Sequence, residues 1–222
     1  ARSDVVFGEI SKERRKGKFI KDPRRLVCLP ANFRNNRRLV VARLEKIKKA
    51  VDSWPYNKLT LKKDARLGII TSGISYGYAV EAIQMLGLED KVSFLKIGTP
   101  YPLPAELTKK LLKAVPEVLV VEELEPFVEE EVKVVAEDND IRVKIHGKDR
   151  LSLVGELSTR LVAEALSKMT GVASPVDFDA LDKIKAETES LLPIRPPTMC
   201  AGCPHRASFY AINIACRRYQ QE

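Results

Sequence analysis

The sequence predicts an α/β fold, a three-layer sandwich that spans residues 58–172 of the 222-residue chain. Strand-like apolar runs alternate with amphipathic stretches of helical period, and the connections between them are short. One run, within Glu117–Val121, is continuously apolar, as strands buried in parallel sheets are. The chain has no internal repeats, so a solenoid is excluded.

Ahead of the sandwich, residues 1–57 are expected to form a basic connector with one short helix, Leu39–Ser53. Leu44, Ile47 and Val51 recur at spacings of three and four, and basic residues occupy the other face. Pro55 ends the helix, since the residue before a proline leaves helical geometry.

Within the sandwich, strands and helices are expected to alternate. The expected strands are Arg66–Thr71, Lys91–Ile97, Glu117–Val121 and Ile141–Ile145, the last an edge strand because apolar and basic residues alternate in it. The expected helices are Ser75–Leu86, Ala105–Ala114, one that Pro126 opens at its first position, and Gly155–Met169.

Beyond the sandwich, residues 173–193 are expected to be a loosely packed linker with a charged helix, Asp179–Leu191. Residues 194–222 form a different unit, a cysteine-rich turn followed by a helix over Ala207–Arg218. That unit is too short to fold alone, so it is interpreted as the truncated start of another domain. Ala1 in place of a start methionine also favours a piece of a longer protein.

Charge is concentrated in the connector. Residues 1–50 hold 16 of the 38 Lys and Arg residues but 5 of the 30 Asp and Glu residues. Such a basic arm can bind nucleic acid. However, Phe7, Phe19 and Phe33 are its only aromatic residues, and proteins that stack nucleic-acid bases on aromatic side chains use more of them. We therefore expect no nucleic acid as partner, and a solvated connector that lies on an acidic neighbouring surface.

Two classes of protein are excluded by composition. The longest uncharged stretch, Leu67–Val80, is shorter than the ~18 residues a membrane helix needs and is broken by polar residues and glycines, so no membrane partner is expected. Four cysteines in a chain of this size do not make a secreted disulfide framework, and a reducing cytoplasm is the expected compartment.

Two stretches are weak candidates for a site. Thr71–Gly77, between a strand and a helix, can hold an anion on backbone N–H groups, but tight packing of helix on sheet explains its glycines better. The acidic runs Glu122–Glu125 and Glu129–Glu131 can do acid–base work, but they flank a helix N-terminus, so a solvated cap that complements the helix dipole is preferred.

The third candidate is Cys200-Ala201-Gly202-Cys203-Pro204-His205-Arg206. Zinc would need His205 and Cys216 as further ligands at unusual spacings, and covalent haem needs the histidine directly after the second cysteine. With Cys203 as cap and Pro204 at the first position, a helix would direct free N–H groups and Arg206 at an anion. A capped helix start with a small buried thiol stays open as the simpler interpretation.

A resemblance narrows these alternatives. The segment Arg195–Arg206 with Phe209-Tyr210 resembles the start of the thiamine-diphosphate domain of the indolepyruvate:ferredoxin oxidoreductase alpha subunit. Lys96–Pro104 and Val121–Pro126 resemble the middle domain of that family, a transketolase C-terminal-like α/β sandwich. Asp22-Pro23 and Pro30–Asn32 resemble its connector.

The resemblance implies oxidative decarboxylation of aryl pyruvates such as indolepyruvate to acyl-CoA, CO2 and reduced ferredoxin. The cofactors implied are thiamine diphosphate, Mg2+ and iron–sulfur clusters, and the partners are a beta subunit, ferredoxin, coenzyme A and the remaining domains of the same subunit. Cys200, Gly202 and Cys203 would line the cofactor pocket, and His205 and Arg206 would contact the diphosphate or the substrate carboxylate.

Parts of the family pattern are missing from these 222 residues, including the magnesium motif and the cysteine-rich tail. We therefore expect no catalytic or metal-binding residue within the chain, and we expect the chain alone to be inactive. A non-catalytic α/β interaction or assembly module is the alternative function, and a basic nucleic-acid-binding protein is the less favoured one.

Overall fold

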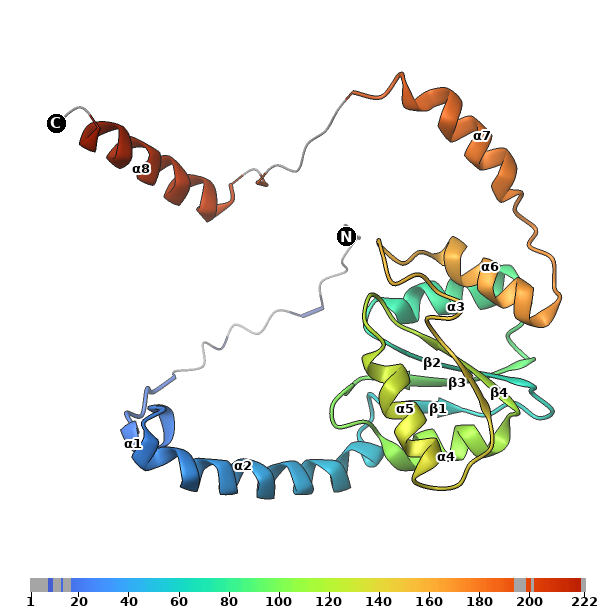
Figure 1. The fold of residues 1–222 in the computed structure, drawn as a ribbon, viewed down its shortest axis with the longest axis horizontal. Helices are drawn as coiled ribbons and strands as arrows, with labels where there is room; N and C mark the ends of the chain where they lie inside the picture. The colour runs from blue at the N-terminus through green and yellow to red at the C-terminus, as the bar shows by residue number, and fades with distance from the viewer. Residues whose placement is uncertain (1–7, 10–12, 14–16, 194–198, 201, 221–222) are drawn as a thin grey trace. The chain divides into compact units, whose positions relative to one another are not determined.

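The structure is a computed structural model that describes residues 8–9, 13, 17–193, 199–200 and 202–220. Contacts between residues divide the chain into two units, residues 1–174 and residues 175–222. The first contains a five-stranded sheet with helices on both faces, so the predicted α/β class is confirmed (Figure 1). In the part of the chain that the structure describes, no helix combines the length and the apolar character needed to cross a bilayer.

The sheet has the strand order β1-β3-β2-β4-β5. The strands are β1 (Lys58–Thr60), β2 (Leu67–Ser72), β3 (Val92–Ile97), β4 (Glu117–Val121) and β5 (Lys144–His146). β2 pairs in parallel with β3 and β4, and β5 pairs in parallel with β4. The four parallel strands were predicted, whereas β1, an antiparallel edge strand of three residues, was not.

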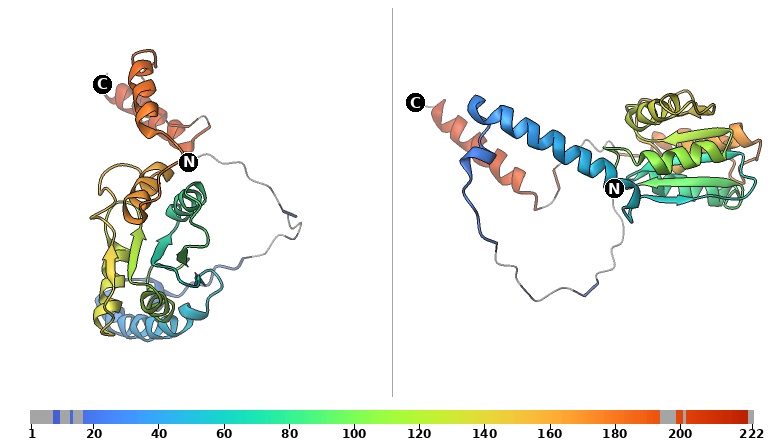
Figure 2. Two further views of the ribbon diagram at one scale, coloured as in Figure 1. Left: turned by 90° about the vertical axis from the view of Figure 1, so that its right-hand side faces the viewer. Right: turned by 90° about the horizontal axis from the view of Figure 1, so that it is seen from below.

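Two pairs of helices cover the sheet (Figures 1 and 2). On one face lie α3 (Ser75–Met85) and α6 (Thr159–Thr170), and on the other lie α4 (Ala105–Ala114) and α5 (Phe127–Glu137). This arrangement confirms the three predicted layers. The strand side chains alternate accordingly: Ile70, Leu95 and Val118 are fully buried in the core with α4 and α5.

Several boundaries differ from the prediction because of capping. α6 begins at Thr159 rather than at Gly155, since the Ser158 hydroxyl accepts a hydrogen bond from the Leu161 amide and Gly155 has φ +88°. Pro126 precedes α5 as its cap instead of opening it. β5 begins at Lys144 rather than at Ile141.

The connector contains more helix than the sequence predicted. α1 (Pro23–Leu26) is followed by α2 (Pro30–Ala50) and a 3-10 turn, Val51–Ser53, so the predicted helix begins nine residues too late. Pro30 sits in the first turn of α2, where its missing N–H has no consequence. The side-chain amide of Asn32 donates to the Pro23 and Val27 carbonyls (3.3 and 3.1 Å), which ties α1 to α2.

The second unit contains two helices, α7 (Phe178–Glu189) and α8 (Pro204–Tyr219). α7 begins at an Asp177 cap whose carboxylate accepts from the Ala180 amide at 2.9 Å. Neither helix has a buried residue.

Candidate functional site

The cysteine motif forms the start of α8. Cys203 is the cap residue and Pro204 the first helical residue, and the Cys203 carbonyl accepts from the Arg206 amide at 3.0 Å. The Cys203 amide donates to the Cys200 carbonyl at 3.1 Å, and Gly202 has φ +75°, a conformation that favours glycine. The helix therefore begins three residues before the predicted Ala207. Arg195 and Ala201, also part of the motif, lie outside the described residues.

Most side chains of the motif that the structure describes are accessible to solvent. The Cys203 thiol lies 3.3 Å from Nδ1 of His205, while Cys200, His205 and Arg206 are exposed. The first N–H groups of a helix have no intrahelical acceptor and carry a partial positive charge. At the start of α8, however, Pro204 has no N–H, and the Cys203 and Arg206 amides already donate to the Cys200 and Cys203 carbonyls. The His205 backbone N–H and the Arg206 guanidinium are therefore the groups that suit a phosphate or carboxylate. The thiol of Cys203 is only half-buried, so the open interpretation of a small buried thiol is wrong for it.

The acidic run after β4 is a buried cap rather than a solvated one. Glu122 is 7% exposed, and its carboxylate oxygens accept from the backbone N–H groups of Val128 (2.8 Å) and Glu129 (2.9 Å) at the start of α5. Burial raises the pKa of Glu122 despite these two hydrogen bonds and the nearby Lys148 ammonium. The predicted dipole-complementing role is confirmed. The predicted solvation holds for Glu123, Glu125, Glu130 and Glu131, which are exposed, and is wrong for Glu122 and Glu129.

Glu129 extends this cluster at 6% exposure. It accepts from Lys133 Nζ (2.5 Å) and from the Lys148 backbone amide (2.9 Å), and the Lys148 ammonium donates to the Glu122 carbonyl (2.5 Å). Desolvation lowers the pKa of Lys148, although the surrounding glutamates oppose this shift. Because each buried carboxylate has N–H donors and an ammonium beside it, the cluster stabilises the loop between β4 and α5.

The turn Thr71–Gly77 is less tightly packed than expected. A Cβ at Gly73 or Gly77 would meet no atom within 4 Å, so close approach of helix to sheet does not require these glycines. Gly73 instead provides φ +57°. Thr71 is fully buried and its hydroxyl has no hydrogen-bond partner in the structure. Lys96 Nζ lies 4.4 Å from the ring centre of Tyr76.

The sequence analysis missed two polar residues, Asn57 and His146, whose hydrogen bonds join separate segments of the chain. Asn57, 7% exposed, donates to the Val51 carbonyl (2.7 Å) and accepts from the Gly98 amide (2.7 Å), which joins the connector to the loop after β3. His146 lies between Asp149 (Nδ1, 2.6 Å) and Glu117 (Nε2, 2.8 Å). Burial alone raises the pKa of Asp149, but hydrogen bonds from His146 and a backbone amide outweigh it and hold that pKa below its usual value. A single polar residue carries no periodic signal, so the hydrogen bonds of Asn57 and His146 could not be predicted without the fold.

Comparison with known proteins shows which family model and which relatives this chain is similar to. The family model for the indolepyruvate ferredoxin oxidoreductase middle domain matches residues 56–156. The chain is 44% identical over 97% of its length to indolepyruvate oxidoreductase subunit IorA of Thermococcus kodakarensis, and 42% identical over 96% to that of Pyrococcus horikoshii. These relatives confirm the resemblance that the sequence analysis reported. The chain spans about a third of their length, 34% of each.

Two solved structures align with part of this chain at low identity. A split-gene transketolase, an inactive beta4 tetramer, is 22% identical with a TM-score of 0.40, over 52% of this chain and 42% of its own. A 2-oxoglutarate:ferredoxin oxidoreductase from Magnetococcus marinus is 19% identical with a TM-score of 0.45, over 64% of this chain and 24% of its own.

Proposed function

We propose that this chain is the central part of the alpha subunit of an indolepyruvate:ferredoxin oxidoreductase. The observation that carries the proposal is the 44% identity to subunit IorA over 97% of the chain. The whole subunit, with a beta subunit, oxidatively decarboxylates aryl pyruvates to acyl-CoA, CO2 and reduced ferredoxin in the cytoplasm. On this proposal the α/β sandwich links the connector to the start of the thiamine-diphosphate domain, and residues 173–193 are the linker.

The motif at the start of α8 would contribute to the cofactor pocket. Thiamine diphosphate, when bound, supplies the carbanion chemistry of decarboxylation. The His205 backbone N–H at the start of α8 and the Arg206 guanidinium would hold its diphosphate, and the His205 side chain would bind the same group or the substrate carboxylate. Gly202 lets the backbone approach the cofactor, since a Cβ there would meet nothing within 4 Å on this chain and its φ is +75°. Cys200 and Cys203 would line the pocket wall.

The described residues offer no ligand set for Mg2+ or an iron–sulfur cluster. Among the described residues no three His, Cys, Asp or Glu side chains gather in a group that could hold a metal ion. The chain has four cysteines, and Cys28 and Cys216 lie far in sequence from the motif, so a four-iron cluster lacks its ligands here. On this proposal the remaining domains bind Mg2+ and the iron–sulfur clusters.

The test uses the full-length subunit assembled with its beta subunit. Arg206→Ala should raise the dissociation constant for thiamine diphosphate at least about tenfold, because it removes a charged contact to the diphosphate. Arg217→Ala, an exposed arginine in the last turn of the same helix, is the matched control and should leave binding unchanged. Indolepyruvate-dependent ferredoxin reduction is measured in parallel.

Two outcomes would contradict the proposal. An assembly that binds thiamine diphosphate but oxidises no aryl pyruvate would refute the function. An Arg206→Ala variant with unchanged cofactor affinity would refute the role of that residue while the function stands.

A further inference from the structure

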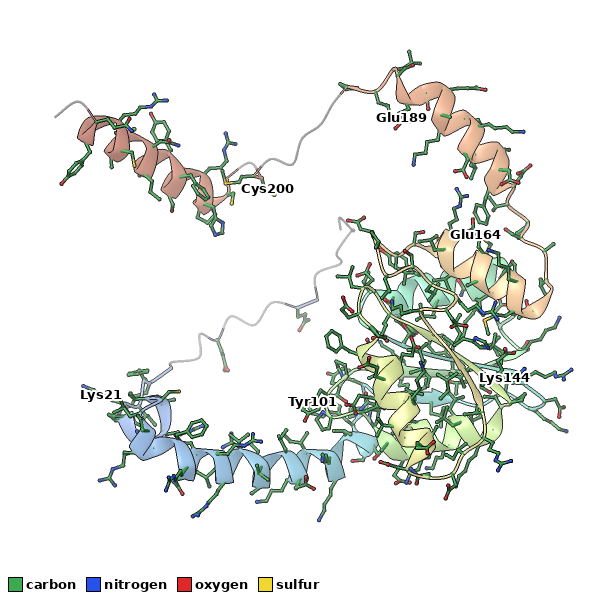
Figure 3. All side chains as sticks on the ribbon, viewed as in Figure 1. Lys21, Tyr101, Lys144, Glu164, Glu189 and Cys200 are labelled. Atoms are coloured by element: carbon green, nitrogen blue, oxygen red, sulfur yellow. The ribbon has the colours of Figure 1, made fainter. Side chains whose placement is uncertain are left out.

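A cavity in the described part of the chain lies at the end of the sheet where the parallel strands begin. It has a volume of about 720 Å3, within the range of about 300–1,000 Å3 typical of small-molecule sites. The first residues of β2, β3, β4 and β5 stand in one row there, because Leu67 pairs with Val92 and Glu117, and Glu117 pairs with Lys144. Figure 3 shows Lys144 at this end of the sheet and Tyr101 at the opposite end.

The cavity gathers positive charge from separate segments. Its cationic lining residues are Lys63, Arg66, Lys91 and Lys144. Among the described residues, none of these four has a carboxylate within ion-pair distance. Four cations, from the loop before β2 and the starts of β3 and β5, therefore line one cavity, and none of them has an ion-pair partner among the described residues.

Two of the three lining carboxylates have a nitrogen partner, and one of these partners, the Lys62 ammonium, is permanently charged. Asp90 lies 2.7 Å from the Lys62 ammonium, whose hydrogen bond and charge lower its pKa. Glu117 lies 2.8 Å from His146 Nε2. Asp64 alone of the three has no such partner among the described residues, so the cavity retains an excess of positive charge. Like charges held together at a concave surface raise the local concentration of anions.

The remaining wall is apolar. Met169 and Val172, at and beyond the end of α6, line it half-buried and present apolar surface. Leu88 and Val92 also line it, but at 1% and 4% exposure they present little surface. A cavity with an apolar wall and clustered cations suits an amphipathic anion better than a simple inorganic one.

We propose that this cavity binds an organic phosphate, with its phosphoryl groups on Arg66, Lys91 and Lys144 and its apolar part against Met169 and Val172. Phosphate is favoured over a single carboxylate because several cations converge, and a guanidinium matches phosphoryl oxygens in a bidentate fork. The site lies at the opposite sheet edge from the Glu122 cluster and belongs to a different unit from the cysteine motif, so its test is independent of the proposed cofactor site.

The experiment measures binding of ATP to the 222-residue chain by calorimetry, with adenosine and inorganic pyrophosphate as separate probes. We expect saturable ATP binding, and at least about tenfold weaker binding of either fragment, because each lacks one half of the recognition. Arg66→Ala with Lys144→Ala should weaken ATP binding at least about tenfold. Val172→Trp should weaken it as well, without any change of charge, by filling the cavity.

Lys110→Ala is the control, since it removes an exposed lysine of α4 that does not line the cavity. Circular dichroism and the Tm of each variant verify folding, and the Val172→Trp and double-alanine variants give two independent readings. Absence of saturable ATP binding would overturn the proposal. So would equal binding of pyrophosphate, which indicates a simple anion site, or ATP binding that survives Val172→Trp and responds only to salt.

Discussion

Glu122 carries a carboxylate that the fold buries to 7% exposure. An isolated buried carboxylate is costly, and burial does raise its pKa. Two backbone N–H groups of α5 and the nearby Lys148 ammonium offset part of this cost. Glu122 thus caps α5 from outside the helix. It directly follows β4 and lies six residues before Val128, the first residue whose amide it binds.

Replacing Glu122 with alanine should lower the free energy of unfolding by about 1–2 kcal/mol, because two buried N–H groups of α5 lose their acceptor. Glu131→Ala, an exposed acidic residue of the same helix, should change it by less than about 0.5 kcal/mol. Urea unfolding followed by circular dichroism measures both. Equal stability of the two variants would show that the Glu122 bonds do not stabilise α5.

At the scale of elements, glycines have opposite roles in two places. A Cβ at Gly147 would lie 2.5 Å from Cδ of Glu129, whose carboxylate is held by Lys133 and by the Lys148 amide. A Cβ at Gly77, inside α3, would meet nothing within 4 Å. The first glycine is required by packing between α5 and the loop after β5, and the second is not.

Gly147→Ala should therefore destabilise the chain by about 1–3 kcal/mol, because Glu129 has to leave its partners or the loop has to move. Gly77→Ala should stabilise it by about 0.5–1 kcal/mol, since alanine is the better helix former. Thermal and urea unfolding of both variants decide the matter. Two variants shifted in the same direction would contradict this assignment.

At the scale of the whole molecule, the chain joins one packed α/β sandwich to helical segments that bury few side chains. α2, α7 and α8 contain no buried residue, whereas the sandwich holds an apolar core. Helices gain most of their stability from packing an apolar face. The segments that carry the candidate cofactor residues thus have the least support within these 222 residues.

We accordingly expect the isolated chain to show no saturable binding of thiamine diphosphate in the presence of Mg2+, as measured by calorimetry. The physical reason is that one helix start supplies diphosphate contacts but no metal ligands and no enclosing wall. Micromolar, magnesium-dependent binding by the isolated chain would refute this expectation.

Prediction from the sequence succeeded where a pattern repeats along the chain. Apolar runs and helical periods located β2, β3, β4, α3 and α4 to within about two residues. The helical period placed the start of α8 three residues too late, at Ala207, whereas the cap-and-proline pattern had offered the Cys203–Pro204 start as an open possibility. Prediction failed for β1, whose three residues show no alternation of their own, and for the first half of α2, where basic residues hide the period.

The sequence by itself determined the fold class, the order of elements and the family motif, because these depend on local spacing and on residues adjacent in the chain. Only the tertiary structure decided which polar groups meet. Asn57 with Gly98, Glu129 with Lys148, and the four cations around the cavity are brought together by strand pairing and helix packing. The two hydrogen bonds join residues 41 and 19 positions apart, and no local pattern encodes them.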